Sequence, residues 1–324
     1  MRAVSTPRAG AGRTLGGLIL VAAAFVAACE GPAEPPEPPS SSGPSSSEPS
    51  PSGPSSVVAG LSVGDDTVTV VAAGDIARNP EDAAGTAALI GSIEPDAVLA
   101  LGDNAYESGS ATEFMENYDP TWGAFKEITR PIPGNHDYKT PNASGYFDYF
   151  RSQIHGQEYY AWDAGRWRMY ALNCDIECGR DSEQLEWLRE DLAAHDDRPA
   201  LAYVHEPYYT CSTRHPPLRR LDDIWRALDD ARTQLVLSGN NHAYERFEPL
   251  DAEGDPSPDG MRQFVVGTGG ARLYPLATPC GHRQAQTDTT HGILKLELNP
   301  DSYTWQFIGV GGEVLDEGEA DVER

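Results

Sequence analysis

The stretch Gly134-Asn135-His136-Asp137 places an amide, an imidazole and a carboxylate directly after a short apolar run. Four more apolar runs along the chain are followed by similar polar residues. The five runs are Val68–Ala73 before Gly74-Asp75, Val98–Leu101 before Gly102-Asp103, Pro131-Ile132-Pro133 before the quoted stretch, Leu201–Val204 before His205, and Leu235–Leu237 before Gly239-Asn240-Asn241-His242. Short apolar runs bounded in this way are typical of buried strands. Because ligands of layered α/β proteins bind at the carboxyl ends of such strands, we expect these polar residues to share one metal centre.

The length and charge of the chain limit the classes of protein to which it can belong. It has 324 residues and a formal net charge of -26. This length suits one large domain or two small ones. The acidic balance argues against a nucleic-acid partner, which needs a basic face, and against attraction to anionic lipid. The simplest interpretation of the charge is solubility.

The N-terminal region has the pattern of a targeting segment. Three arginines precede the apolar run Leu15–Ala28, which is too short to span a bilayer comfortably. The run ends in Val26-Ala27-Ala28-Cys29, which resembles a bacterial lipobox, where cleavage occurs before the Cys and its thiol is lipidated. The alternative is an ordinary secretory signal that ends near a Cys. We predict a lipoprotein signal over residues 1–28 and an exported protein, either tethered to the outer face of the cell membrane through Cys29 or secreted.

The segment over residues 29–66 is predicted to be a linker. From Glu30 to Ser56 it consists almost entirely of Pro, Ser, Gly and Glu. Such a segment buries little apolar surface and stays extended and disordered. We therefore expect a folded domain over residues 67–324.

Four cysteines lie in the expected domain. An even number in an exported protein suggests two disulfides, for which three pairings are possible. We expect Cys174–Cys178 and Cys211–Cys280, because the first two share one loop. A zinc site is the alternative, but the spacing lacks paired Cys-x-x-Cys motifs.

Helical and strand patterns alternate along the first part of the domain. Helices are predicted over Pro80–Ile90, Asp181–Ala194 and Leu218–Ala231, and a hairpin over Tyr159–Asn173. Strand patterns without a long helix follow over Gln263–Val266, Ile293–Leu298 and Tyr303–Ile308. This order predicts an α/β protein with two packed sheets and helices outside.

The polar strand ends provide the ligands of a two-metal site. Asp75, Asp103 and His242 are of the kind that hold divalent or trivalent first-row metals. A carboxylate has two oxygens, so Asp103 can bridge two metals. Asn135 and His205 add a neutral oxygen and an imidazole for the second metal. Two metals about 3.5–4 Å apart would clamp a phosphate and activate a water near neutral pH.

The five blocks together resemble the motifs of the calcineurin-like metallophosphoesterases in order and spacing. These blocks are Gly74-Asp75, Gly102-Asp103-Asn104-Ala105-Tyr106, Gly134-Asn135-His136-Asp137, His205-Glu206-Pro207 and Gly239-Asn240-Asn241-His242-Ala243-Tyr244-Glu245-Arg246. Three details resemble the purple acid phosphatase branch, namely Ala77 in place of a His, Tyr106 three places after Asp103, and the ending Tyr244-Glu245-Arg246.

The resemblance implies a four-layer α/β/β/α metallophosphoesterase sandwich with two mixed β-sheets. It also implies a dinuclear centre that hydrolyses phosphate monoesters by attack of a metal-bound hydroxide. The implied ligands are Asp75, Asp103, Tyr106 and His242 for metal one, and Asp103, Asn135, His205 and Asn240 for metal two. In this branch a Tyr ligand accompanies ferric iron. The implied cofactors are therefore iron at the Tyr106 site and a divalent metal (Fe, Zn, Mn or Mg) at the other site.

Two histidines are candidates for catalysis. His136, beside the ligand Asn135, can donate a hydrogen bond to the phosphate or protonate the leaving oxygen. His215 occupies roughly the place of a substrate-contacting His in members of the family. The alternative for His215 is a side chain that faces solvent.

Residue 240 departs from the family pattern, which is Gly-His-x-His. Here the sequence is Gly239-Asn240-Asn241-His242, so an amide replaces the first imidazole. A carbonyl oxygen suits Mg, Mn or Ca better than zinc or ferrous iron. The second metal is therefore expected to be weakly held, to be a harder cation, or to be absent.

Three functions remain open at this point. The main hypothesis is an exported, metal-dependent, acid phosphatase-like enzyme with a small phosphorylated substrate. A phosphodiesterase or 5′-nucleotidase of the same superfamily is the near alternative. The alternative from another class is a surface lipoprotein that binds phosphate or metal without turnover, because Asn240 replaces a ligand His. No nucleic-acid binding is expected, and no protein partner can be inferred.

Overall fold

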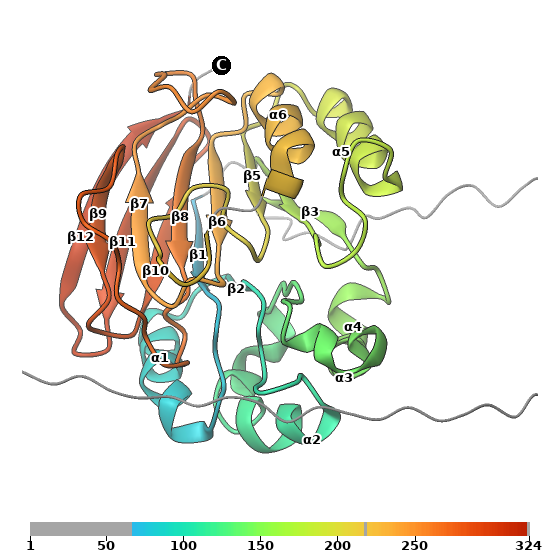
Figure 1. Cartoon of the computed structure of the whole chain (residues 1–324), viewed down its shortest axis with the longest axis vertical. Helices are drawn as coiled ribbons and strands as arrows, with labels where there is room; N and C mark the ends of the chain where they lie inside the picture. The colour runs from blue at the N-terminus through green and yellow to red at the C-terminus, as the bar shows by residue number, and fades with distance from the viewer. Residues whose placement is uncertain (1–66, 217–218, 323–324) are drawn as a thin grey trace, which may run out of the picture. The chain divides into compact units, whose positions relative to one another are not determined.

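The computed structural model describes residues 67–216 and 219–322. The predicted signal over residues 1–28 and the predicted linker over residues 29–66 lie outside the described residues. The described residues lie within the predicted domain over residues 67–324. Figure 1 shows this domain as two β-sheets with helices around them.

The first sheet has five strands in the order β12-β11-β10-β1-β2. Their bounds are β1 (Val68–Ala73), β2 (Ala97–Ala100), β10 (Gly292–Leu298), β11 (Ser302–Gly309) and β12 (Val314–Asp321). Strand β1 pairs in parallel with β2 and antiparallel with β10, so the sheet is mixed. The beginning and the end of the domain therefore meet in one sheet.

The second sheet has seven strands in the order β3-β4-β5-β6-β8-β7-β9. Their bounds are β3 (Tyr160–Ala164), β4 (Trp167–Ala171), β5 (Ala200–Tyr203), β6 (Leu235–Ser238), β7 (Tyr244–Phe247), β8 (Arg262–Val266) and β9 (Arg283–Thr287). Strands β4, β5, β6 and β8 are parallel. The strands at both ends of the sheet are antiparallel, so this sheet is also mixed.

Alternate residues of the central strands face two different cores. In β6, Leu235 and Leu237 belong to the core shared by the two sheets, whereas Val236 packs with α5 (Glu183–Ala194) and α6 (Asp222–Asp230). Successive side chains of a strand point to opposite faces, so a continuous apolar run can serve both cores. The predicted sandwich with two mixed sheets is confirmed.

The two longest helices, α1 (Pro80–Ile93) and α5, begin at side-chain caps. The Asn79 side chain accepts a hydrogen bond of 2.9 Å from the Asp82 N–H at the start of α1, which packs against the first sheet. Ser182 caps α5 in the same way. The shorter helices are α2 (Ala111–Glu113), η1 (Phe114–Tyr118), η2 (Trp122–Ile128), η3 (Asp137–Lys139), η4 (Pro141–Ala143), α3 (Ser144–Tyr149), α4 (Arg151–Ile154) and η5 (Arg219–Leu221). None of the helices in the described residues combines the length and apolarity needed to cross a membrane.

One predicted strand is wrong. Pro131-Ile132-Pro133 forms only an isolated bridge between Ile132 and Leu101, in which the Ile132 N–H donates to the Ala100 carbonyl at 2.9 Å. The prolines on both sides have no N–H to extend the pairing. The segment still runs beside the end of β2, which brings the following stretch Gly134-Asn135-His136-Asp137 to the expected edge.

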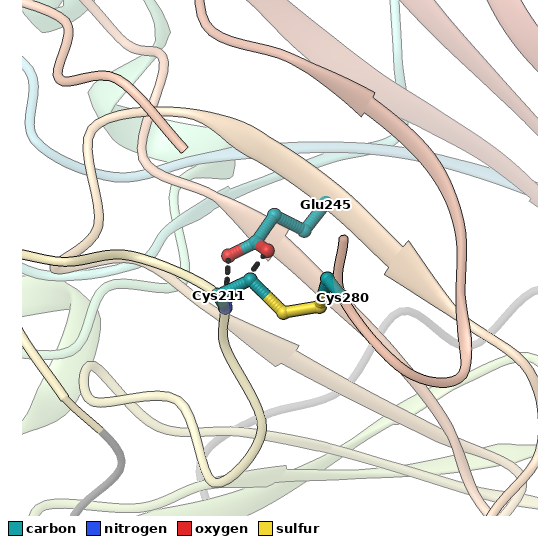
Figure 2. A group of neighbouring side chains, drawn as sticks. All are labelled: Cys211, Glu245 and Cys280. Atoms are coloured by element: carbon teal, nitrogen blue, oxygen red, sulfur yellow. Dashed lines mark hydrogen bonds between the residues drawn. A yellow bond between two sulfur atoms is a disulfide. The ribbon is translucent and has the colours of Figure 1, made fainter. Parts of the chain in front are cut away.

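Both predicted disulfides are present. Cys174 is bonded to Cys178 and Cys211 to Cys280, with Cα–Cα distances of 5.3 Å and 6.0 Å. Figure 2 shows the second disulfide beside the Glu245 carboxylate, which accepts hydrogen bonds from the Cys211 N–H. Because bonded sulfurs are not thiolates, this arrangement does not support the zinc alternative.

Candidate metal centre

Four of the predicted site residues follow the carboxyl ends of parallel strands. Asp75 follows β1, Asp103 follows β2, His205 follows β5 and His242 follows β6. The Asp75 N–H donates to the Gly102 carbonyl at 3.0 Å, which joins the first two strand ends. The ligand atoms of Asp75, Asp103 and His205 all lie within 4.8 Å of one another.

One side of this cluster contains the ligands predicted for metal one. The Tyr106 hydroxyl lies 3.0 Å from Asp75 Oδ1, 3.0 Å from Asp103 Oδ2 and 3.3 Å from His242 Nε2. His242 Nε2 lies 3.1 Å from Asp75 Oδ1. Two carboxylates, a phenol and an imidazole therefore converge on one point.

The other side of the cluster begins at the second oxygen of Asp103. His205 Nε2 lies 3.4 Å from Asp103 Oδ1, whereas Oδ2 faces Tyr106. Asp103 thus stands between the two predicted ligand sets. This is the position that a bridging carboxylate requires.

Backbone carbonyls fix the orientation of both imidazoles. Leu101 O accepts from His205 Nδ1 at 2.7 Å, and Arg272 O accepts from His242 Nδ1 at 2.7 Å. With the proton on Nδ1, the lone pair of Nε2 is aimed into the cluster, as in metal-binding histidines. Within the described residues, His205 Nε2 and Asp75 Oδ2 are buried and have no hydrogen-bond partner. Buried lone pairs that face carboxylates fit a cation.

The charges of the cluster depend on one another. Burial raises the pKa of Asp103, but the adjacent His205 outweighs it and lowers this pKa to about 2. Burial lowers the pKa of His205, but the Asp103 carboxylate holds it well above its usual value. Burial, together with the carboxylates of Asp103 and Asp75, raises the pKa of Tyr106 well above its usual value. The buried carboxylates therefore favour positive charge between these groups, which a metal ion supplies.

Unusual backbone conformations position the predicted ligands. Asp75, Asp103 and Asn240 have φ angles of 58°, 50° and 61°, in the left-handed region that residues other than glycine rarely adopt. At Gly134, an added Cβ would collide with the backbone nitrogen of Asp103 and lie 2.7 Å from His205 Nε2. Such conformations cluster at functional sites, where the surrounding structure maintains them.

Sequence comparison agrees with this geometry. The family model described as Calcineurin-like phosphoesterase matches residues 68–244, which include both sides of the cluster. The chain belongs to the calcineurin-like phosphoesterase family.

Curated relatives of this phosphoesterase confirm the resemblance to the purple acid phosphatase branch. The chain is 28% identical over 219 residues to Purple acid phosphatase 15 of Arabidopsis thaliana, covering 55% of this chain and 40% of the relative. It is 26% identical over 226 residues to Purple acid phosphatase 22 of the same plant, covering 61% and 49%. The chain thus covers less than half of the length of these two relatives.

Solved structures share the fold of this phosphoesterase. The TM-score is 0.65 at 15% identity to purple acid phosphatase PPD1 of yellow lupin (Lupinus luteus), covering 79% of this chain and 54% of the lupin chain. It is also 0.65 at 12% identity to GAP50, described as the anchor in the inner membrane complex of Plasmodium, covering 80% and 90%. At these identities the likeness shows the fold alone.

The cluster of this phosphoesterase opens into a cavity of about 310 Å³. Seven predicted site residues line it, namely Asp103, Tyr106, Asn135, His136, His215, Asn240 and His242. The other two, Asp75 and His205, are buried. Asp75 accepts a hydrogen bond from the Tyr106 hydroxyl, and His205 lies beside Asp103. The structure therefore brings every predicted site residue to one place.

The two candidate catalytic histidines both reach the cavity. The ring of His136 lies 4.5 Å from the ring of Tyr106, its Nδ1 lies 2.8 Å from the Glu107 carbonyl oxygen, and its Nε2 lies 3.9 Å from Asp103 Oδ2. His215 is half-buried, and burial lowers its pKa. It lines the cavity, and the substrate-contacting hypothesis stays a prediction.

Asn135 and Asn240 line the same cavity with free amide groups. Within residues 67–216 and 219–322, neither side chain makes a hydrogen bond. Asn240 is only 9% exposed. Both amides are therefore available to a ligand in the cavity.

The sequence analysis missed six residues of the cavity wall. They are Arg78, Glu107, Arg214, Ala271, Arg272 and Tyr274. Two of them had a signal, since Arg214 precedes His215 and Arg272 follows the glycine-rich stretch Gly267-Thr268-Gly269-Gly270 closely. Isolated arginines are common on surfaces, so only the folded chain distinguishes these from the others.

Proposed function

We propose that this protein is an exported phosphatase that hydrolyses phosphate monoesters at a dinuclear metal centre. The observation that carries the proposal is the position of Asp103 between two ligand groups. Tyr106 lies at one of its carboxylate oxygens and His205 at the other, at 3.0 Å and 3.4 Å. The purple acid phosphatase relatives support phosphoester hydrolysis.

Each side of the cluster suits a different metal. Asp75, Asp103, Tyr106 and His242 would hold the first metal, and Asp103, Asn135, His205 and Asn240 the second. Because burial and two carboxylates keep the Tyr106 phenol protonated, a strongly charged cation such as ferric iron is needed to bind it as phenolate. Asn240 offers an oxygen, which favours a harder divalent cation at the second position. Such a pair of metals neutralises phosphate charge and lowers the pKa of water.

The chain's own groups orient the substrate. His136 is held by the Tyr106 ring, the Glu107 carbonyl and the Lys139 ammonium, so its imidazole is positioned before the substrate binds. We propose that it donates a proton to the leaving oxygen or a hydrogen bond to the phosphate. His215 contacts the substrate from the same cavity.

The proposed signal and the cysteines support the proposed location of the protein. Two disulfides in the described domain support an oxidising compartment. We propose a signal over residues 1–28, a linker over residues 29–66, a catalytic domain over residues 67–324 and a membrane tether through lipidated Cys29. The substrate is a small phosphorylated molecule, with no nucleic-acid partner.

One observation favours a second candidate function. Asn240 lacks the imidazole of the family pattern, so a weakened centre that binds phosphate or metal without turnover is the alternative. A phosphodiesterase or 5′-nucleotidase activity differs only in the substrate that the cavity accepts.

Metal content and hydrolysis together test the proposed function. We expect two metals per chain and turnover of p-nitrophenyl phosphate, and we expect Asp103→Ala to lose both metals and to reduce kcat at least about 1,000-fold. Circular dichroism checks that the variant is folded. One metal or none, with no turnover after addition of Fe, Zn, Mn or Mg, would support the binding protein instead. Turnover of bis(p-nitrophenyl) phosphate alone would indicate a diesterase.

A further inference from the structure

The cavity wall is basic in a strongly acidic protein. The formal net charge of the chain is -26, yet three arginines, Arg78, Arg214 and Arg272, line the cavity. Apart from the proposed ligand Asp103, the acid in this wall is Glu107. Arg78 pairs with it at 2.7 Å, so these two charges compensate each other.

Arg214 and Arg272 remain uncompensated. Within residues 67–216 and 219–322, neither guanidinium forms an ion pair. The Arg272 backbone instead accepts the hydrogen bond that orients His242. An arginine fork without a carboxylate partner has all its donors available to a phosphate.

The Arg214 side chain is already positioned. Its guanidinium lies over the Tyr274 ring, 4.3 Å from the ring centroid. That ring stacks on the His242 imidazole with centroids 4.3 Å apart and planes inclined by 16°. The Tyr274 N–H also donates to the His242 carbonyl at 3.0 Å. Arg214 is therefore separated from a proposed metal ligand by one aromatic ring.

The two loops that carry these arginines are joined to each other. The disulfide between Cys211 and Cys280, which Figure 2 shows, links the chain shortly before Arg214 to the chain shortly after Arg272. Buried Glu245 accepts from the Thr210 hydroxyl at 2.6 Å and from the Cys211 N–H at 3.0 Å. This cross-link keeps the two guanidinium groups on one wall.

We propose that Arg214 and Arg272 bind a second phosphate of the substrate. The preferred substrate is then a small organic bisphosphate, whose first phosphate lies at the metal centre. The proposal rests on the proposed phosphatase function. A bare monoester would leave both guanidinium groups without a partner, whereas a second phosphate provides charge-assisted hydrogen bonds for them.

A matched pair of substrates tests the proposal. Using the full chain with its bound metals, we would measure kcat and KM for glucose 6-phosphate and glucose 1,6-bisphosphate. We expect a KM at least about tenfold lower for the bisphosphate, since a charge-assisted hydrogen bond changes affinity by that order. Arg214→Gln and Arg272→Gln should remove this preference, so that the ratio of the two KM values falls to about one. Arg226→Gln, an exposed change on α6, is the control and should retain the preference.

Two results separate this proposal from the proposed function. Equal KM values for both substrates, or a preference that survives in both cavity variants, would overturn the second-phosphate site while leaving the phosphatase intact. If neither substrate is hydrolysed, the phosphatase proposal fails. Calorimetry then measures the affinities for glucose 6-phosphate and glucose 1,6-bisphosphate. The arginine site is supported only if the bisphosphate binds at least about tenfold more tightly. Arg214→Lys keeps the charge but not the planar fork. We therefore expect its preference for the bisphosphate to be weaker than in the wild type but stronger than in Arg214→Gln.

Discussion

Asn240 departs from the family's sequence pattern and has an unusual backbone conformation. Its φ of 61° lies in the left-handed region, where Asn, Asp and His are the most common residues after glycine. Its amide faces the cavity within the proposed second ligand set. A histidine is therefore compatible with the backbone at this position, and the choice of Asn changes the ligand chemistry alone.

We predict that Asn240→His strengthens the second metal site. An imidazole nitrogen binds zinc or ferrous iron better than an amide oxygen does. Because even outer partners of metal ligands change affinity by about 10–100-fold, the gain in zinc affinity should be at least about tenfold. Competition with a chelator measures this affinity.

The first metal site provides the control for Asn240→His. Its proposed ligands Asp75, Tyr106 and His242 are unchanged, so iron content per chain should stay the same. Identical zinc affinity in the two proteins would show that residue 240 is not a metal ligand.

At the scale of elements, β7 joins three parts of the molecule. Tyr244 and Arg246 point to one face and Glu245 to the other, as alternation along a strand requires. The Asp316 carboxylate on β12 of the first sheet accepts from the Tyr244 hydroxyl at 2.7 Å and from Arg246 Nε at 2.7 Å. The ending Tyr244-Glu245-Arg246 of the last motif thus has a structural role, in which it ties the sheets and the Cys211 loop together.

We predict that Asp316→Asn destabilises the domain by about 2 kcal/mol, because hydrogen bonds to a charged group contribute about 1.5–3 kcal/mol. An amide of the same shape cannot accept from Arg246 with both of its terminal atoms. Urea unfolding at pH 7 measures the change in the free energy of unfolding. Glu317→Gln, the exposed neighbour on β12, is the control and should change it by less than about 0.5 kcal/mol.

The contribution of Asp316 should depend on pH. Burial raises the pKa of Asp316, but the hydrogen bonds from Arg246 and Tyr244 outweigh it and lower this pKa below the ordinary value. An acid with a lowered folded pKa contributes stability that is complete above its unfolded pKa of about 3.9 and is lost as the pH falls through the folded pKa. The stability difference between wild type and Asp316→Asn should therefore shrink below about pH 4. A difference that stays constant down to about pH 2 would contradict this assignment.

At the scale of the whole molecule, the two disulfides close loops of very different length. Cys211–Cys280 spans 69 positions and Cys174–Cys178 spans 4. In the chain-entropy model a longer closed loop restricts the unfolded chain more, by about 4 kcal/mol for the first and about 2 kcal/mol for the second. We therefore predict that Cys211→Ser with Cys280→Ser lowers the free energy of unfolding more than Cys174→Ser with Cys178→Ser.

Urea unfolding of both double variants checks this order. The Cys211 pair should also raise the KM for the bisphosphate, because its loss uncouples the two arginine loops. The Cys174 pair serves as the control for that effect. A larger stability loss from the Cys174 pair would contradict the entropic account.

The sequence by itself determined most of the central strands and the candidate metal ligands. Period-two and apolar runs locate β1, β5, β6 and β10 within one residue or so, because strand formation there depends on local composition. The residues after each run could be assigned to one site, because carboxyl ends of neighbouring strands share an edge. The same local logic failed at Pro131-Ile132-Pro133, where apolarity resembled a strand but the prolines lack donors.

Only the tertiary structure decided which elements meet. The pairing of β1 with β10, the contact of Asp316 with Arg246, and the gathering of Arg214 and Arg272 on one cavity wall all join residues far apart in sequence. A single sequence has no local pattern for such contacts, because they arise from the packing of whole sheets and loops. The candidate ligands could therefore be predicted from the strand ends, whereas the proposed selectivity for a second phosphate depends on loops that only the folded chain brings together.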